Sequence, residues 1–230
     1  MSSDTFKALF NDPDHAARYA DGPTRFMPGY DSVQRMASVL IRERTGENAH
    51  VLVHGAGGGA EIGTFAQLNP RWTFTGVEPA RAMLDQAIAF LGPLKDRVAM
   101  HHGYIDDAPD GPFDAATSLL TLHFIEEEAR SETVSQIIRR LKPGAPFVTV
   151  HCSFPQIGPL RDEWLLRHRA FTITGGTPAE VAEKGRADLD ERIPVLNPST
   201  DEAILRNAGL TEVTEFFSAF TWRGWVGYAP

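Results

Sequence analysis

Residues 51–59 read Val51-Leu52-Val53-His54-Gly55-Ala56-Gly57-Gly58-Gly59, a short apolar run that stops in a glycine-rich loop. The apolar run is typical of a buried strand, and the glycines let the backbone pass close to a ligand. Residues 60–68 continue with a helical pattern, so the free N–H groups of a helix start follow the loop. This strand–loop–helix unit predicts a ligand site at the carboxyl end of a parallel sheet.

Strands and helices alternate on the carboxyl-terminal side of this unit. The pattern predicts strands over 72–77, 98–101, 113–120 and 146–151, with helices over 80–91 and 126–141. After Cys152 the alternation lapses, and residues 160–192 read as a charged helical insertion lying over the sheet. A helix over 201–208 and strands over 212–218 and 220–228 close the chain. The few residues between these last strands require them to be antiparallel neighbours.

The first fifty residues read as helical and polar, with short helices over 14–19 and from Asp31 and a turn-rich loop over 25–30. We therefore predict one α/β domain over residues 1–230, with a mostly parallel sheet and an antiparallel carboxyl-terminal hairpin. Its parts are a helical cap (1–48), a core (49–152) that binds the ligand, a helical insertion (153–198), and a last helix with the hairpin (199–230).

Composition excludes several classes of protein. No run approaches the roughly 18–20 apolar residues that span a bilayer, and the amino terminus lacks the pattern of a secretory signal. A single cysteine, Cys152, excludes an internal disulfide and a cysteine-based zinc site. The net charge of −8 argues against direct nucleic-acid binding. We expect a cytoplasmic protein without a membrane partner.

An acidic residue follows the glycine loop at the spacing that a nucleoside ligand requires. Glu78 lies roughly twenty residues after the loop, at the end of the second predicted strand, where it can accept hydrogen bonds from ribose hydroxyls. Gly55-x-Gly57-x-x-Ala60 also satisfies the dinucleotide pattern, so a nicotinamide-dependent oxidoreductase stays open. A non-enzymatic protein that binds a cofactor and regulates a partner stays open too, because no catalytic base is certain.

The order of these features resembles the class I S-adenosylmethionine-dependent methyltransferases. Residues 51–59 are similar to their first motif and Gly76-Val77-Glu78-Pro79 to their second, and the Leu141-Lys142-Pro143-Gly144 turn precedes the fifth strand as in that family. The resemblance implies a Rossmann-like class I methyltransferase sandwich that uses S-adenosyl-L-methionine and releases S-adenosyl-L-homocysteine. A small molecule is the expected methyl acceptor.

A closer resemblance, to the carboxy-S-adenosylmethionine synthase family, rests on residues 25–31, 120–124 and 216–220. It implies a homodimer, carboxy-S-adenosyl-L-methionine as a possible cofactor, and cofactor contacts from Tyr30 and Arg186. The alternative function is then synthesis of that cofactor from S-adenosylmethionine and prephenate, linked to tRNA wobble-uridine modification.

This chain departs from the pattern of the synthase family at three places. Tyr104 precedes Ile105 where the family has aspartate, Leu119 stands where it has asparagine, and Glu78-Pro79 replaces Asp-Asn. We interpret the chain as a relative that keeps the scaffold and the cofactor but uses a different acceptor.

The candidate site residues follow from the motifs and from the resemblance. We expect the cofactor to be bound by Tyr30, His54, Gly55, Ala56, Gly57, Glu78, Pro79, Met83, Tyr104, Ile105, Leu119 and Arg186. His123 and Tyr30 are the candidate catalytic residues, His123 as a general base and Tyr30 as a ring beside the sulfonium.

Structural roles remain open for two of these residues, and no metal site is expected. His123 can instead be a residue that caps the pocket, and Arg186 a solvated charge. Because His101 and His102 are adjacent on a predicted strand, their side chains point to opposite faces. Displacement at a sulfonium needs positioning and a dry site rather than a nucleophilic triad.

Overall fold

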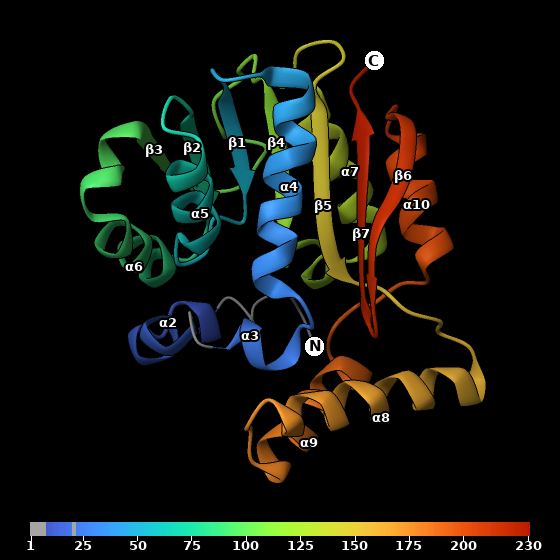
Figure 1. Cartoon of the computed structure of the whole chain (residues 1–230). Helices are drawn as coiled ribbons and strands as arrows, with labels where there is room; N and C mark the ends of the chain where they lie inside the picture. The colour runs from blue at the N-terminus through green and yellow to red at the C-terminus, as the bar shows by residue number, and fades with distance from the viewer. Residues whose placement is uncertain (1–7, 20–21) are drawn as a thin grey trace.

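The computed structural model describes residues 8–19 and 22–230, and its centre is a seven-stranded sheet (Figure 1). The strand order is β3-β2-β1-β4-β5-β7-β6. The first five strands are parallel, and β7 pairs antiparallel with both β5 and β6. The strands are β1 (His50–His54), β2 (Thr73–Glu78), β3 (Val98–His102), β4 (Ala115–Leu119), β5 (Pro146–Cys152), β6 (Thr211–Ala219) and β7 (Trp222–Tyr228). The predicted α/β class and the antiparallel hairpin are confirmed.

Successive side chains of β1 point to opposite faces of the sheet, and apolar residues pack against them on both faces. Val51 and Val53 pack with Ile41 and Phe65 of the helices on one face, whereas Leu52 belongs to the cluster on the other face. The helices are α2 (Pro13–Tyr19), α3 (Pro23–Phe26), α4 (Tyr30–Thr45), α5 (Ala60–Leu68), α6 (Arg81–Leu91), α7 (Glu127–Ile138), α8 (Gly158–Thr174), α9 (Ala179–Glu191) and α10 (Pro198–Asn207). Short 3-10 turns are η1 (Gly92–Arg97) and η2 (Leu122–Phe124).

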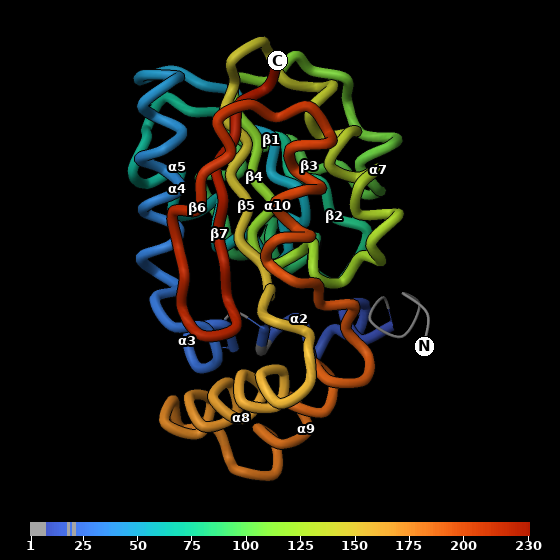
Figure 2. Tube along the Cα trace, turned by 90° about the vertical axis from the view of Figure 1, so that its right-hand side faces the viewer, coloured from blue at the N-terminus to red at the C-terminus, as the bar shows by residue number. Residues whose placement is uncertain are grey.

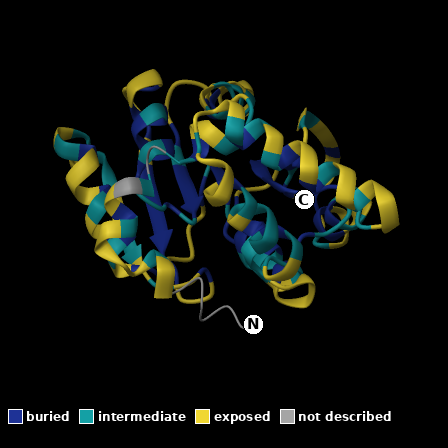
Figure 3. Ribbon diagram, turned by 90° about the horizontal axis from the view of Figure 1, so that it is seen from below, coloured by how far each residue is buried: buried dark blue, intermediate teal, exposed yellow. Residues whose placement is uncertain are grey.

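Layers on the two faces of the sheet come from different parts of the chain. Buried residues of α4 and α5 pack on one face, and buried residues of α7 and α10 on the other. Seen along the strands, the sheet is buried and the outer faces of the helices are exposed (Figure 3). No helix among the described residues is long and apolar enough to cross a membrane.

The helical insertion forms a hairpin of α8 and α9 beyond the carboxyl ends of the parallel strands (Figure 2). It packs against α3 at close range, since a Cβ atom at Gly175 would lie 2.6 Å from the carbonyl oxygen of Arg25. The rings of Phe26 and Trp222 stack with centroids 5.8 Å apart, and His168 of α8 lies beside both rings. The insertion is therefore tied to the amino-terminal helices as well as to the sheet.

A buried ion pair joins α7 to α10 behind the sheet. Nη1 of Arg130 lies 2.5 Å from Oδ1 of Asp201, and both side chains are 1% exposed. Ser153 donates a 2.6 Å hydrogen bond to the other oxygen of Asp201, and Nε2 of His151 lies 3.1 Å from Oδ1. Arg130 also donates to the carbonyl oxygens of residues 125 and 194. Because the three guanidinium nitrogens of Arg130 all have acceptors, the burial of this charged pair is compensated.

Candidate cofactor site

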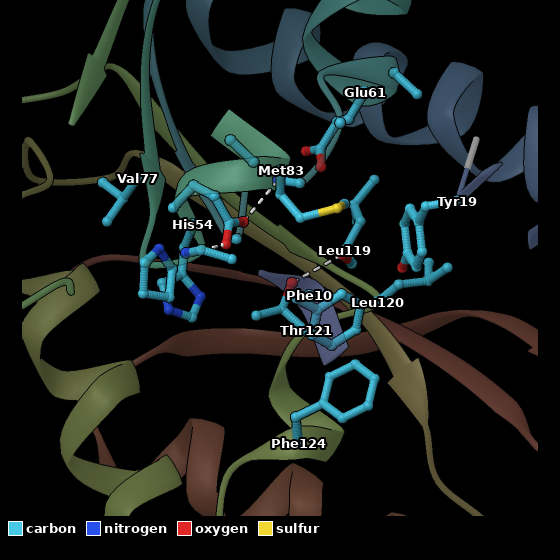
Figure 4. A pocket seen from close by; sticks show the side chains of 18 of the residues that line it. Phe10, Tyr19, His54, Glu61, Val77, Met83, Leu119, Leu120, Thr121 and Phe124 are labelled. Atoms are coloured by element: carbon cyan, nitrogen blue, oxygen red, sulfur yellow. Dashed lines mark hydrogen bonds between the residues drawn. The ribbon is translucent and has the colours of Figure 1, made fainter. Parts of the chain in front are cut away.

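A cavity of about 260 Å³ opens at the carboxyl ends of β1, β2 and β4. Its size is near the lower end of the roughly 300–1,000 Å³ that small-molecule pockets occupy. The walls come from the glycine loop after β1, the ends of β2 and β4, and helices α4, α5 and α6 (Figure 4). The sequence predicted a ligand site at this edge of the sheet, and the cavity lies there.

Glycine is required at the first position of the loop for two reasons. Gly55 has φ of +70°, in the left-handed region that L side chains rarely adopt. A Cβ atom there would lie 2.2 Å from Oγ1 of Thr121. The backbone N–H groups of Gly55 and Ala56 both donate to the carbonyl oxygen of Val77, so the loop is fixed against the end of β2.

Glu78, the last residue of β2, holds the same loop through its side chain. One carboxylate oxygen accepts a 2.9 Å hydrogen bond from the N–H of Gly57, and the other accepts one of 2.9 Å from the N–H of Ala80. Burial raises the pKa of Glu78, and the two hydrogen bonds oppose that shift. A carboxylate oxygen has two acceptor directions, so each oxygen can still accept a ribose hydroxyl.

His54 lies in the wall of the cavity as a neutral ring. Its Nδ1 is 3.0 Å from Oγ of Ser118, and the side chain is buried. Burial lowers the pKa of His54 to about 4, so the ring carries no charge at neutral pH. The ring therefore contributes hydrogen bonding and shape to the site.

Tyr30 reaches the pocket because of a turn before α4. Gly29 has φ of +74°, which turns the chain so that Tyr30 is the first residue of the helix. Burial, followed by the nearby Glu61 carboxyl, raises the pKa of Tyr30 to about 12. Gln34, one turn further along α4, accepts a 2.5 Å hydrogen bond from Thr64 of α5, which fixes the two helices to each other. Tyr30 thus offers a neutral phenol and a ring face.

Most of the residues predicted to bind the cofactor line this one cavity. They are Tyr30, His54, Gly55, Ala56, Gly57, Glu78, Pro79, Met83, Tyr104 and Leu119. Ile105 does not line it, because its side chain belongs to the buried cluster beneath β1 and β2.

Arg186 lies on α9 and does not line the cavity either. Its Nε is 2.7 Å from an oxygen of Glu183, and its Nη1 is 3.2 Å from Oδ2 of Asp190. Arg161 of α8 also pairs with Asp190. The guanidinium therefore belongs to an ion-pair network inside the insertion, a structural role that the sequence left open for this residue.

His123 lies behind the pocket wall. It is 4% exposed, and its Nδ1 is 3.5 Å from the backbone nitrogen of Cys152. Its ring lies between Phe124 and Trp222, with centroids 4.2 and 5.5 Å away. Burial, with added effects of neighbouring charges, holds the pKa of His123 well below its ordinary value. This geometry favours the capping role over the general base.

Neither His101 nor His102 takes part in a metal cluster among the described residues. Nε2 of His101 lies 2.9 Å from Oδ1 of Asp107, and the same oxygen accepts the N–H of Tyr104. These bonds order the loop that brings Tyr104 to the rim of the cavity.

The segment before α3 closes the open side of the pocket, which the sequence did not indicate. Phe10, Asn11 and Tyr19 line the cavity, and the ring of Phe10 meets those of Tyr19 and Phe124 edge-on at 5.6 and 5.4 Å. The side-chain oxygen of Asn11 accepts a 2.8 Å hydrogen bond from the backbone N–H of Arg81, the first residue of α6. This end of the pocket is therefore aromatic and shielded from water.

Glu61 is the second acidic residue of the cavity, and sequence reasoning missed it. It lies in the first turn of α5, is 7% exposed, and burial raises its pKa to about 8. The helical pattern held a usable signal, because Glu61 falls on the same face as Ile62 and Phe65, which pack in the core.

Comparison with known proteins agrees with this architecture. Residues 51–144 match the family model of a methyltransferase domain. A carboxy-S-adenosyl-L-methionine synthase of Campylobacter fetus subsp. fetus is 23% identical over 219 residues, which are 92% of this chain and 88% of the relative.

Two solved structures are similar to the fold of this chain. PigF bound to S-adenosylhomocysteine superposes with a TM-score of 0.67 at 17% identity, covering 99% of this chain and 62% of that one. Human N-acetylserotonin methyltransferase bound to S-adenosylmethionine gives a TM-score of 0.61 at 13% identity, covering 97% of this chain and 58% of that one. The chain thus spans less than two thirds of the length of either structure. Residues 51–144 thus match a methyltransferase domain, and the fold of the chain is that of these methyltransferase structures, as the resemblance implied.

Proposed function

We propose that this protein, an S-adenosylmethionine-dependent methyltransferase by its domain and fold, transfers a methyl group to a small-molecule acceptor. The observation that carries the proposal is the cradle of Gly55, Gly57 and Glu78 at the edge of the sheet. There the carboxylate of Glu78 would bind the ribose hydroxyls, and the loop would lie along the methionine part of the cofactor. S-adenosylhomocysteine is the expected product.

The aromatic end of the pocket suits the chemistry of methyl transfer. The methyl group leaves a sulfonium with its bonding electrons remaining on sulfur, and an acceptor lone pair forms the new bond in line. Phe10, Tyr19, Tyr30 and Phe124 provide ring faces and edges that exclude water there, and ring faces favour a cation. No described side chain is placed as a clear general base, so we propose positioning and desolvation as the main sources of rate.

The alternative, synthesis of carboxy-S-adenosylmethionine, has weaker support from the site. The extra carboxylate of that cofactor calls for a guanidinium. Among the described residues that line the cavity there is no arginine or lysine, and Arg186 is paired with Glu183 and Asp190. The 23% identity to the Campylobacter synthase keeps this alternative as the second candidate.

Mass spectrometry of the small molecule released on denaturing freshly purified protein tests the proposal first. S-adenosylmethionine or S-adenosylhomocysteine supports it, and carboxy-S-adenosylmethionine supports the second candidate. A nicotinamide nucleotide would contradict both, because the glycine loop would then serve the dinucleotide pattern.

A variant of Glu78 tests the ribose contact itself. We expect Glu78→Ala to weaken S-adenosylhomocysteine binding in calorimetry by about 10–100-fold, from the loss of charge-assisted hydrogen bonds. Wild-type protein should prefer adenosine to 2′,3′-dideoxyadenosine as a competitor, and the variant should lose that preference. Glu180→Ala, at an exposed residue of α9, is the control. An unchanged preference in Glu78→Ala would refute the assignment of Glu78.

The homodimer and the cytoplasmic location remain proposals. Apolar side chains on the insertion support a subunit contact, since Leu160, Leu166 and Val181 are 52%, 58% and 57% exposed. Light scattering on the purified protein would test it, with a monomer mass as the contradicting result.

A further inference from the structure

Glu61 is a buried acidic residue in the pocket wall, and its hydrogen bonds do not satisfy both of its carboxyl oxygens. It lies in the first turn of α5, is 7% exposed and lines the cavity. Figure 4 shows its carboxyl group directed into the pocket, on the side of Met83. Within the described part of the chain its Oε1 has no hydrogen-bond partner. A buried polar atom without a partner is costly, so it is uncommon outside functional sites.

The surroundings of Glu61 supply no positive charge. Tyr30 of α4 and Thr117 of β4 face it, and both are neutral. The cavity lining, within the described residues, includes no lysine or arginine. His54 is the one histidine of that lining, and its ring is neutral and bonded to Ser118. A carboxylate at Glu61 would therefore need its counter-charge from a ligand.

The two acidic residues of the pocket are prepared for different groups. Glu78 has both oxygens tied to backbone N–H groups, which fixes it as an acceptor for hydroxyls. Glu61, by contrast, lies next to Tyr30 and keeps its Oε1 without a hydrogen-bond partner among the described residues. The start of α5 favours negative charge at Glu61, although burial opposes it.

We propose that Glu61 binds a positively charged group of the cofactor, either its α-ammonium or its sulfonium. This inference rests on the proposed function, because it presumes a cofactor with these groups. The assignment makes Glu61 a cofactor-binding residue that neither the glycine loop nor the acidic residue at the end of β2 would indicate. Binding would also drive a proton off Glu61, since burial raises the pKa of the empty site to about 8.

The test is calorimetric binding of three ligands to wild type and to Glu61→Gln. S-adenosylmethionine carries both cations, S-adenosylhomocysteine carries only the ammonium, and 5′-methylthioadenosine carries neither. We expect Glu61→Gln to weaken S-adenosylmethionine binding by at least about tenfold and to change 5′-methylthioadenosine binding by less than about twofold. If Glu61→Gln weakens S-adenosylhomocysteine binding equally, the bound group is the ammonium. If S-adenosylhomocysteine binding is unchanged, the bound group is the sulfonium.

Equal effects on all three ligands, or no effect on any, would overturn the role of Glu61. Failure of wild-type protein to bind any of the three is a different result, which would refute the proposed function itself. Glu127→Gln is the matched control, because Glu127 also lies in the first turn of a helix, α7, but is exposed. Glu61→Met, of similar volume and also uncharged, should reproduce the effect of Glu61→Gln if the charge is responsible.

A second readout follows the proton. Titrations in two buffers of different ionisation enthalpy measure the protons released on binding. At neutral pH we expect S-adenosylmethionine to release close to one proton from wild type and none from Glu61→Gln. Tyr30 of α4 and Thr117 of β4 face this carboxyl, and neither of them titrates near neutral pH. Equal proton release from both proteins would overturn the assignment.

Discussion

Alanine substitutions at two glycines of the same loop distinguish the cost of backbone strain from the cost of steric overlap. Gly55 and Gly57 both have positive φ, +70° and +50°. A Cβ atom at Gly57 would find its nearest neighbour, the methyl group of Met83, at 3.6 Å, an ordinary contact. A Cβ atom at Gly55 would lie 2.2 Å from Oγ1 and 2.6 Å from Cγ2 of Thr121. Alanine at Gly57 therefore meets only backbone strain, while alanine at Gly55 meets both penalties.

The expected cost follows from these two terms. Left-handed backbone at a residue with a Cβ atom costs roughly 1–2 kcal/mol, and overpacking adds about 1–3 kcal/mol. We expect Gly57→Ala to lower the free energy of unfolding by about 1–2 kcal/mol and Gly55→Ala by about 2–5 kcal/mol. Urea unfolding followed by circular dichroism measures both values on the cofactor-free protein.

A double variant identifies the source of the difference. Thr121→Ala removes the two closest atoms and leaves Cβ at 2.9 Å, so it should recover about 1 kcal/mol when combined with Gly55→Ala. Thr121→Ala also loses the hydrogen bond to the carbonyl oxygen of Leu119. The coupling energy between the two substitutions must therefore be calculated from all four proteins of the double-mutant cycle. Equal losses in Gly55→Ala and Gly57→Ala, within about 0.5 kcal/mol, would refute the steric argument.

Three further predictions concern other parts of the chain. The buried carboxyl of Glu61 binds its proton more tightly in the folded state than in the unfolded state. The free energy of unfolding of the cofactor-free protein should therefore fall as pH rises from about 5 to about 8, by at most about 1.4 kcal/mol per pH unit. Urea unfolding measures this slope, and Glu61→Gln should flatten it. Asp201→Asn leaves Arg130 buried without its counter-charge and should cost about 3–5 kcal/mol in the same assay. Burial alone would raise the pKa of Asp201, but His151 and Arg130 outweigh it and hold the pKa below its ordinary value. The stabilisation by Asp201 is therefore present above about pH 4 and lost as pH falls further, and Asp201→Asn should lack this acid limb. Asn11→Ala removes the hydrogen bond to the start of α6 and should weaken S-adenosylhomocysteine binding about 3–10-fold. The free energy of unfolding should change by less than about 1 kcal/mol. Equal losses of binding free energy and of unfolding free energy would contradict a closing role for this segment.

Local patterns predicted the parts of the fold that local forces determine. Residues 60–68 form a helix with the predicted bounds, because a glycine turn starts it and its apolar face is continuous. β4 is shorter than predicted, Ala115–Leu119 instead of 113–120, since Phe113 pairs with the turn after α7 and Leu120 has positive φ. α7 likewise ends at Ile138, before Leu141, where tighter turns begin.

The residues that line the cavity divide in the same way. The place of Glu78 in that lining was predictable, because the spacing from glycine loop to acidic residue is fixed by one strand–helix–strand unit. Phe10 was not, since its ring reaches the pocket through contact with Phe124, far away in the sequence, and the adjacent Asn11 is held by the equally distant Arg81. Nothing in the local sequence around Phe10 records such a contact.

The two ends of the pocket come from different segments of the chain, so they can change independently. The cradle of Gly55, Gly57 and Glu78 comes from the glycine loop and the end of β2, whereas the aromatic end combines residues 10–34 with residues 119–125. Cofactor binding can therefore persist while the aromatic end changes, because different segments of the chain build the two ends. Substitutions at Tyr19 or Phe124 should then alter the choice of acceptor and keep the affinity for S-adenosylhomocysteine within a few-fold of the wild-type value. Glu78→Ala should weaken cofactor binding whichever acceptor is used. A screen of amine, hydroxyl and thiol compounds against wild type and Phe124→Ala tests this, and a parallel loss of cofactor affinity in Phe124→Ala would show that the two ends are not separable.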